Sequence, residues 1–164
     1  MIFVCVGTQL PFDRLIRAMD DWCEENGADA FAQIGDVGSM GYVPKNMEWE
    51  RFLGADEWDQ KFSAAQVVVS HAGMGTIISA LMAGKPSVIM PRQAAYQEHR
   101  NDHQIATAKR FGGRSGVHVA IDELELPRVV EAAMHQPAVD TQPLGRYADP
   151  MLIEVIRGFI LAGK

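Results

Sequence analysis

VVVSHAGMGTIISALMAGKP, residues 67–86, is the stretch that decides the fold of this chain. A β-branched strand pattern runs into a loop with two glycines and a hydroxyl residue, and an apolar helical run from Ile77 to Ala83 follows, which Gly84 ends. Glycines let the backbone approach a ligand closely, and the unpaired N–H groups at the N-terminus of a helix attract anions. The stretch therefore predicts a phosphate-bearing ligand at its loop, which consists of His71, Ala72, Gly73, Met74, Gly75 and Thr76.

Strand and helix patterns alternate along the chain on both sides of this loop. Helical spacing of apolar residues is expected from Phe12 to Cys23, and further helices over 56–65, from about 101 to 111 and from 122 or a few residues later to 135. Strands are expected over 2–6, 31–34, 67–70, 87–90 and 117–121. This alternation predicts an α/β fold with a Rossmann-like parallel sheet and helices on both faces. The turn-rich segment 36–47 receives no assignment.

The patterns divide the chain into one α/β domain and a tail. Residues 1–135 are predicted to form the domain, and 136–150, with three prolines, an irregular crossing segment. Residues 151–164 are predicted to form a helix with one apolar face made of Leu152, Val155, Ile156, Phe159 and Ile160.

Composition excludes several classes of protein. With 164 residues, 48% hydrophobic and 22% charged, the chain suits one globular α/β domain. A formal net charge of −6 argues against a nucleic-acid partner. Cys5 and Cys23 fit buried thiols in a reducing cytoplasm. The segment Met1–Val6 is too short for a signal peptide, and no run approaches the ~18 apolar residues of a spanning helix. We therefore expect a cytoplasmic protein.

Polar groups follow three of the predicted strands. The first strand is followed by Gly7, Thr8 and Gln9, the third by the glycine loop, and the fourth by a segment from Pro91 to Asn101 that is rich in side-chain donors and acceptors. Ligands of open parallel sheets bind beyond the carboxyl ends of the strands. We expect a nucleotide-sugar pocket there, in which backbone amides hold the phosphates and side chains bind hydroxyl groups.

The glycine loop, the segment Glu98-His99-Arg100-Asn101-Asp102-His103-Gln104 and the opening Val6–Asp13 together resemble the donor-binding half of MurG-like glycosyltransferases. The resemblance covers roughly residues 1–135. It is strongest to a split subgroup, the bacterial exopolysaccharide glycosyltransferase subunits of the PssE type. Their eukaryotic counterpart is the catalytic subunit of the dolichol-linked N-acetylglucosaminyltransferase. The implied fold is the C-terminal half of a GT-B glycosyltransferase.

The resemblance implies roles for individual residues. Thr8, with Gly7 and Gln9 beside it, matches a loop near the donor diphosphate, and the loop from His71 to Thr76 matches the one that wraps the nucleotide. Phe52 and Leu53 match a segment that contacts the base. Polar residues expected to hold the donor sugar are Gln97 and Glu98, with His99 and Asn101 beside them. Ser79 stands where the family has a ribose-binding glutamate, so ribose recognition is expected to be weaker or to come from another residue.

The function implied is an inverting transfer from a UDP-sugar to a lipid-linked acceptor in polysaccharide or glycoconjugate synthesis. A membrane-associated partner subunit would hold the acceptor, which would place this chain peripherally at the inner membrane face. The apolar C-terminal face from Leu152 to Ile160 is the expected docking element. No cofactor or metal is expected, because His99 and His103 have a zinc-like spacing without a third ligand. His71 is a candidate catalytic residue, and the general base is not identified.

Two alternatives remain open from the residues. A non-catalytic enhancer subunit would bind no UDP-sugar by itself. Another Rossmann-type nucleotide-binding enzyme is disfavoured, because the turn Gly7-Thr8-Gln9-Leu10-Pro11-Phe12 lacks the Gly-x-Gly-x-x-Gly pattern. Trp22, Trp49 and Trp58 are expected to be packing residues.

Overall fold

The computed structural model describes residues 1–135 and 150–162, and its centre is a six-stranded sheet. All neighbouring strands are parallel, and their order across the sheet is β3-β2-β1-β4-β5-β6. The predicted Rossmann-like parallel sheet is therefore confirmed. The strands are β1 (Ile2–Cys5), β2 (Ala30–Gln33), β3 (Glu48–Glu50), β4 (Val67–His71), β5 (Ser87–Met90) and β6 (Val117–Val119).

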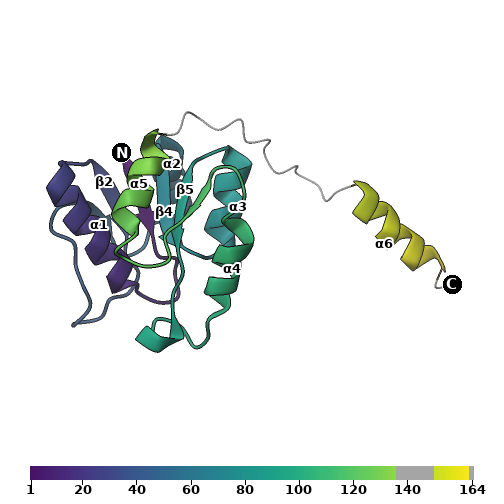
Figure 1. Ribbon diagram of the computed structural model, residues 1–164, viewed down its shortest axis with the longest axis horizontal. Helices are drawn as coiled ribbons and strands as arrows, with labels where there is room; N and C mark the ends of the chain where they lie inside the picture. Colours follow the sequence, from purple (N-terminus) through teal and green to yellow (C-terminus); the bar gives the residue numbers. More distant parts are fainter. Residues whose placement is uncertain (136–149, 163–164) are drawn as a thin grey trace.

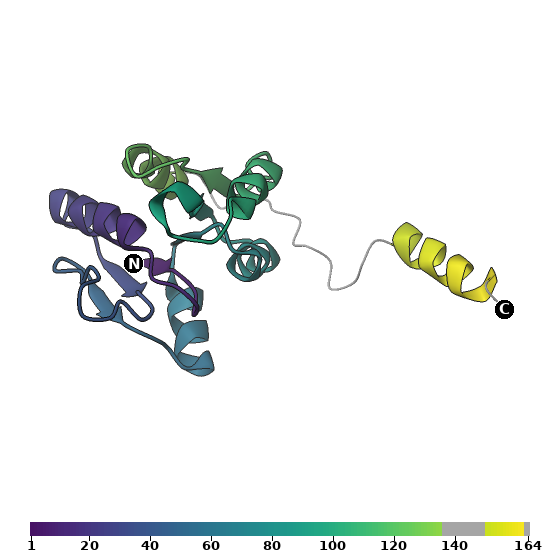
Figure 2. The same ribbon diagram turned by 90° about the horizontal axis from the view of Figure 1, so that it is seen from below.

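Helices cover both faces of the sheet (Figures 1 and 2). The first face carries α1 (Asp13–Asn26) and α5 (Leu126–His135), whose apolar residues share one core cluster with the sheet. The opposite face carries α2 (Ala55–Ala64), α3 (Met74–Ala83) and α4 (His103–Phe111). A short 3₁₀ turn, η1 (Ala94–Tyr96), lies between β5 and α4.

Strand β1 shows why these residues form a central strand. Ile2 and Val4 belong to the core under α1 and α5, whereas Phe3 and Cys5 belong to the core under α2. Successive side chains of a strand point to opposite faces, and a strand covered on both faces therefore reads as a continuous apolar run. Full burial of each such side chain contributes about 1.5–3 kcal/mol.

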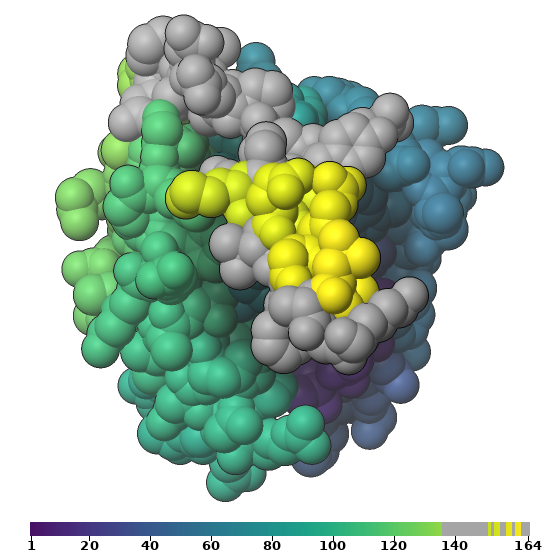
Figure 3. All heavy atoms as spheres, turned by 90° about the vertical axis from the view of Figure 1, so that its right-hand side faces the viewer, coloured from purple at the N-terminus to yellow at the C-terminus, as the bar shows by residue number. Residues whose placement is uncertain are grey.

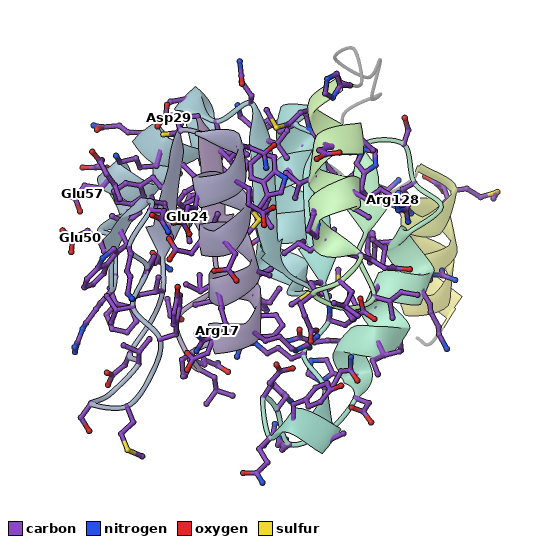
Figure 4. All side chains as sticks on the ribbon, turned by 60° about the vertical axis from the view of Figure 1, so that its left-hand side comes forward. Arg17, Glu24, Asp29, Glu50, Glu57 and Arg128 are labelled. Atoms are coloured by element: carbon purple, nitrogen blue, oxygen red, sulfur yellow. The ribbon has the colours of Figure 1, made fainter. Side chains whose placement is uncertain are left out.

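Helix α1 is amphipathic. Leu15, Ile16 and Trp22 are buried against the sheet, whereas the charged side chains of Arg17 and Glu24 lie on the outer surface (Figure 4). Both cysteines are buried and free, as predicted.

Helix ends follow the predicted stops more closely than the predicted starts. Gly27 and Gly84 end α1 and α3 in the left-handed conformation, with φ of 58° and 62°, which glycine adopts without a Cβ penalty. Helix α3 begins at Met74, three residues before the apolar run that signals it. The two glycines of the loop are thus the N-cap and the second residue of this helix.

Two carboxylates of α1 hold the unassigned segment 36–47. The Tyr42 N–H donates to Asp13 Oδ2 at 3.0 Å, and the Tyr42 hydroxyl donates to Asp20 Oδ2 at 2.6 Å. Asp20 is fully buried and also accepts the backbone N–H groups of Lys45 and Asn46 at 2.9 and 2.7 Å. The segment is therefore fixed by side-chain contacts to α1 and not by regular structure.

Beyond the domain the structure describes α6 (Pro150–Ala162), which stands apart from the sheet and its other helices (Figures 1 and 2). Figure 3 views the molecule from the side on which α6 lies. The predicted crossing segment lies largely outside the described residues, as do the side chains of Leu152, Val155, Ile156 and Phe159 in the predicted docking face. Ile160, the fifth member, is 63% exposed. Within the described residues, no helix is both long enough and apolar enough to span a membrane.

Candidate nucleotide-sugar site

A cavity of about 730 Å³ opens beyond the carboxyl ends of β1 and β4. The strand order reverses between these two strands, because β2 and β3 lie on one side of them and β5 and β6 on the other. Such a switch point is where open α/β sheets bind ligands. The cavity wall comes from the loop after β1, from the start of α2, from the β4–α3 loop and from the start of α4.

The N-terminus of α3 supplies free backbone donors to this cavity. Gly73, Met74, Gly75 and Thr76 line it, and the N–H groups of a first helical turn have no partner within the helix. The N–H of Gly73, the N-cap, donates to the His71 oxygen at 2.7 Å, so the donors that face the cavity are those of Met74, Gly75 and Thr76. No side chain caps α3 and its first turn carries no acidic residue. Helix α2, by contrast, has two acidic residues in its first turn. The positive end of the α3 dipole is therefore uncompensated and faces the cavity, as an anion site requires.

His71 explains why two of the glycines are needed. Its ring lies between the loop after β1 and the start of α3. A Cβ built on Gly7 would lie 2.9 Å from His71 Cε1, and one built on Gly73 would overlap the ring. Gly7 also has a φ of +80°, which favours glycine. The imidazole thus occupies the space that side chains at positions 7 and 73 would need.

Burial lowers the pKa of His71 to about 4, and the positive charge of Arg92 contributes to the same shift. The imidazole is therefore neutral near pH 7, where one ring nitrogen donates a hydrogen bond and the other accepts one. A neutral ring in this position can donate to a bound oxyanion without carrying a charge of its own.

Arg92 fixes the shape of the loop after β1. Its side chain is 2% exposed, and its guanidinium donates to the backbone oxygens of Val6 at 2.8 Å, Leu10 at 2.6 Å and Pro11. Burial lowers the pKa of Arg92 to about 10, so the group stays charged at neutral pH. Gln33 supports the same loop, because its Nε2 donates to the oxygen of Gly7 at 3.3 Å. Sequence reasoning placed Arg92 in a polar segment but gave it no such role.

Glu98 is held by Arg14 of α1. Arg14 donates from Nε to Glu98 Oε1 at 2.7 Å and from Nη2 to Oε2 at 2.8 Å, and a third bond joins its Nη1 to Glu123 Oε2 at 2.8 Å. Glu98 also accepts the N–H of Gln93 at 2.9 Å. Gln97, directly before it, has a φ of 58°. The carboxylate expected at the donor sugar therefore has protein partners in this structure.

The structure brings most, but not all, of the predicted site residues to the cavity. Gly7, Thr8 and Gln9 line it together with His71 and the start of α3, and Leu53 and His99 line it as well. The cavity lining does not include Ala72, Ser79, Gln97, Glu98, Asn101 and Phe52. The last of these is 48% exposed. Their predicted roles toward a donor remain predictions.

Several lining residues were missed by sequence reasoning. His103 lies edge-on to His99 with ring centroids 4.5 Å apart, and Gln104 accepts the Arg92 N–H at 3.1 Å. Trp58 stacks on Phe62 at 4.7 Å, as expected of a packing residue, and also lines the cavity. Its neighbours in the wall are Ala55 and Asp59. These residues lie near the starts of α2 and α4, and only the strand order shows that both helices start beside the cavity.

No group of three or more His, Cys, Asp or Glu residues among those described is placed to hold a metal ion. Among the residues that the structure describes, Asp59 has the only carboxylate in the cavity lining.

Residues 1–143 match the model of the glycosyltransferase family 28 C-terminal domain, and the chain belongs to this family.

Solved glycosyltransferases have the same fold. MurG of Acinetobacter baumannii gives a TM-score of 0.57 at 19% identity, over 80% of this chain and 40% of that one. VinC, solved with dTDP, gives 0.54 at 19% identity over 84% and 34%. UDP-glucose:anthocyanidin 3-O-glucosyltransferase, solved with UDP, gives 0.60 at 15% identity over 84% and 32%. The chain thus has the fold of the C-terminal half of a GT-B glycosyltransferase and spans 32–40% of these three proteins.

Proposed function

We propose that this chain is the donor-binding subunit of an inverting glycosyltransferase that uses a UDP-sugar. The observation that carries the proposal is the uncapped N-terminus of α3 at the switch point of the sheet, facing a cavity large enough for a nucleotide. Family membership supports it, as does the binding of UDP or dTDP by proteins of the same fold.

The composition of the wall suggests how the donor lies. The diphosphate would bind the backbone N–H groups of Met74, Gly75 and Thr76 and of the loop after β1. The apolar wall of Leu53 and Trp58, on the α2 side, suits a nucleobase. On the α4 side, His99, His103 and Gln104 offer donors and acceptors for the hydroxyl groups of the transferred sugar.

Transfer would proceed by direct attack of an acceptor hydroxyl on the anomeric carbon. A new C–O bond forms, the bond from that carbon to the β-phosphate oxygen breaks, and its electron pair leaves with UDP. The positive end of α3, together with a hydrogen bond from neutral His71, would stabilise the leaving diphosphate without a metal. The proton of the acceptor hydroxyl passes to a general base that we place outside this chain.

We further propose that a separate, membrane-associated subunit holds a lipid-linked acceptor, as the resemblance to split exopolysaccharide enzymes implies. Helix α6 is the proposed docking element, and the large exposed fractions of Ile160 and Leu161, 63% each, support this. In such a complex the chain would act peripherally at the cytoplasmic face of the membrane.

Calorimetric titration of the purified chain with UDP, with and without EDTA, tests the proposal directly. We expect binding that EDTA does not change, and UDP-sugar transfer only after the partner subunit is added. Binding that EDTA abolishes would contradict the metal-free mechanism. No binding of UDP or UDP-sugars under either condition would favour an enhancer subunit, and full activity of the isolated chain would contradict the two-subunit arrangement.

A further inference from the structure

The cavity has a strongly biased set of charges. Within the described part of the chain, its lining holds one buried arginine, Arg92, and three histidines, but only one carboxylate, that of Asp59 in α2. A wall built for a diphosphate gains nothing from a negative charge, because the carboxylate would repel the phosphates. Asp59 is therefore expected to contact a part of the ligand other than the phosphates.

Asp59 has no evident part in holding the fold together. No hydrogen bond or ion pair of its carboxylate is found among the described residues, and its side chain is exposed. It lies past the first turn of α2, where the helix dipole is weak. Glu57, two residues earlier, does have such a part, since its Oε2 accepts the Gly54 N–H at 3.0 Å at the start of the helix.

The neighbours of Asp59 suggest what it meets. Leu53, Ala55 and Trp58 form the apolar part of the same wall, and Trp58 is held flat against Phe62. An apolar surface beside a single carboxylate suits a nucleoside, because the base covers the apolar surface and the adjoining ribose presents hydroxyl donors. A carboxylate has two oxygens and accepts from two neighbouring hydroxyls at once. Acidic residues bind ribose hydroxyls in this way in other nucleotide sites of doubly wound sheets.

We propose that Asp59 accepts hydrogen bonds from the 2′ and 3′ hydroxyls of the donor ribose, and that this contact makes the chain selective for ribonucleoside over 2′-deoxyribonucleoside diphosphates. The inference rests on the proposed function of the cavity. It assigns the ribose contact to α2, whereas Ser79 of α3 lies outside the cavity lining.

The test compares UDP with 2′-deoxy-UDP in calorimetric titrations at fixed ionic strength and in the presence of EDTA. Wild-type chain, Asp59→Ala and Asp59→Asn are measured, and Asp56→Asn is the matched control, because Asp56 is an exposed carboxylate of the same helix outside the cavity lining. We expect wild type and Asp56→Asn to prefer UDP by roughly tenfold, as the loss of one charge-assisted hydrogen bond predicts. Asp59→Ala removes the partner of both hydroxyls, so it should weaken UDP binding by about 100-fold. It should weaken 2′-deoxy-UDP binding, in which only the 3′ hydroxyl can meet Asp59, by about tenfold, so that the preference disappears.

Other results overturn the assignment. Equal losses for both nucleotides would show a general electrostatic effect, and unchanged binding would show that Asp59 meets no part of the nucleotide. A loss seen with a UDP-sugar but not with UDP would move Asp59 to the transferred sugar. In these cases the wild type still binds UDP and the proposed function stands, whereas a wild type that binds neither nucleotide contradicts both.

Discussion

Replacing Gly75 by valine is expected to abolish most nucleotide binding without weakening the fold. Gly75 is the second residue of α3 and lines the cavity, and a Cβ built on it meets no heavy atom within 4 Å. Its backbone is not in the left-handed region. The valine side chain therefore meets no protein atom, and it fills the space that we assign to the diphosphate.

The two effects differ in sign and size. In a helix glycine is about 1 kcal/mol less favourable than alanine and valine up to about 0.7, so the substitution is neutral or slightly stabilising. A valine over the helix N-terminus keeps phosphate oxygens from the N–H groups there. The loss of one such charge-assisted hydrogen bond costs about 1.5–3 kcal/mol, which corresponds to a loss of affinity of roughly 10- to 100-fold.

Urea unfolding and calorimetric titration with UDP measure the two effects on one protein sample. Gly113→Val is the matched control, because a Cβ there also meets nothing within 4 Å and Gly113 lies outside the cavity lining. We expect the control to bind UDP as the wild type does. A folded Gly75→Val chain with wild-type affinity would refute the phosphate assignment, and a substantial loss of stability would show that the space around Gly75 is needed by the protein itself.

Three further predictions concern His71, Glu98 and α6. The pKa of His71 is about 4 in the folded chain and ~6.5 in the unfolded chain, so the unfolded chain binds more protons between these pH values. Stability should therefore fall as the pH drops from 6.5 toward 4, by at most about 3 kcal/mol. Urea unfolding at pH 7 and pH 5 measures this loss, and an equal loss of stability in His71→Gln would contradict the prediction. Glu98→Ala should cost about 1.5–3 kcal/mol of stability, because Glu98 pairs with Arg14 and both side chains are at most 13% exposed. The same change should reduce sugar transfer and leave UDP affinity nearly intact, since the family resemblance implies that Glu98 contacts the donor sugar and not the nucleotide. Glu123→Ala, at 39% exposure, should cost under about 1 kcal/mol, and equal costs would show that the Glu98 pair contributes nothing special. Truncation after Pro150 should leave a folded domain that binds UDP but no longer forms a complex with the partner in pull-down experiments; retained full activity with the partner would contradict the docking role, and aggregation would show that α6 is part of the core.

The strand and helix order could be predicted because it depends on local patterns. The run Ile2–Cys5 and the valines at 67–69 are apolar and buried on both faces, and runs of this length are typical of strands. Stops at Gly27 and Gly84 follow from a backbone conformation that glycine adopts most easily. The glycine loop could also be predicted, since its chemistry lies in six consecutive residues, 71–76.

Contacts between distant residues could not be predicted. Arg14 and Glu98 are 84 positions apart, and nothing in either neighbourhood indicates the pair. The segment 36–47 has no regular pattern because its order comes from Asp13 and Asp20 of α1, which lie 29 and 22 positions before Tyr42. Trp58 fitted a packing role and has one, but its second surface faces the cavity only because α2 begins beside the switch point.

The contacts of Arg92 have a consequence for the order in which the domain forms. The loop after β1 is synthesised before the group that its carbonyl oxygens bind, which lies 82 and 86 positions later. Contacts this far apart in sequence form only after a long loop has closed, which slows folding. The loop after β1 therefore has to wait for β5 to join the sheet, and during synthesis at the ribosome a nucleotide would find no complete site until the chain had passed Arg92.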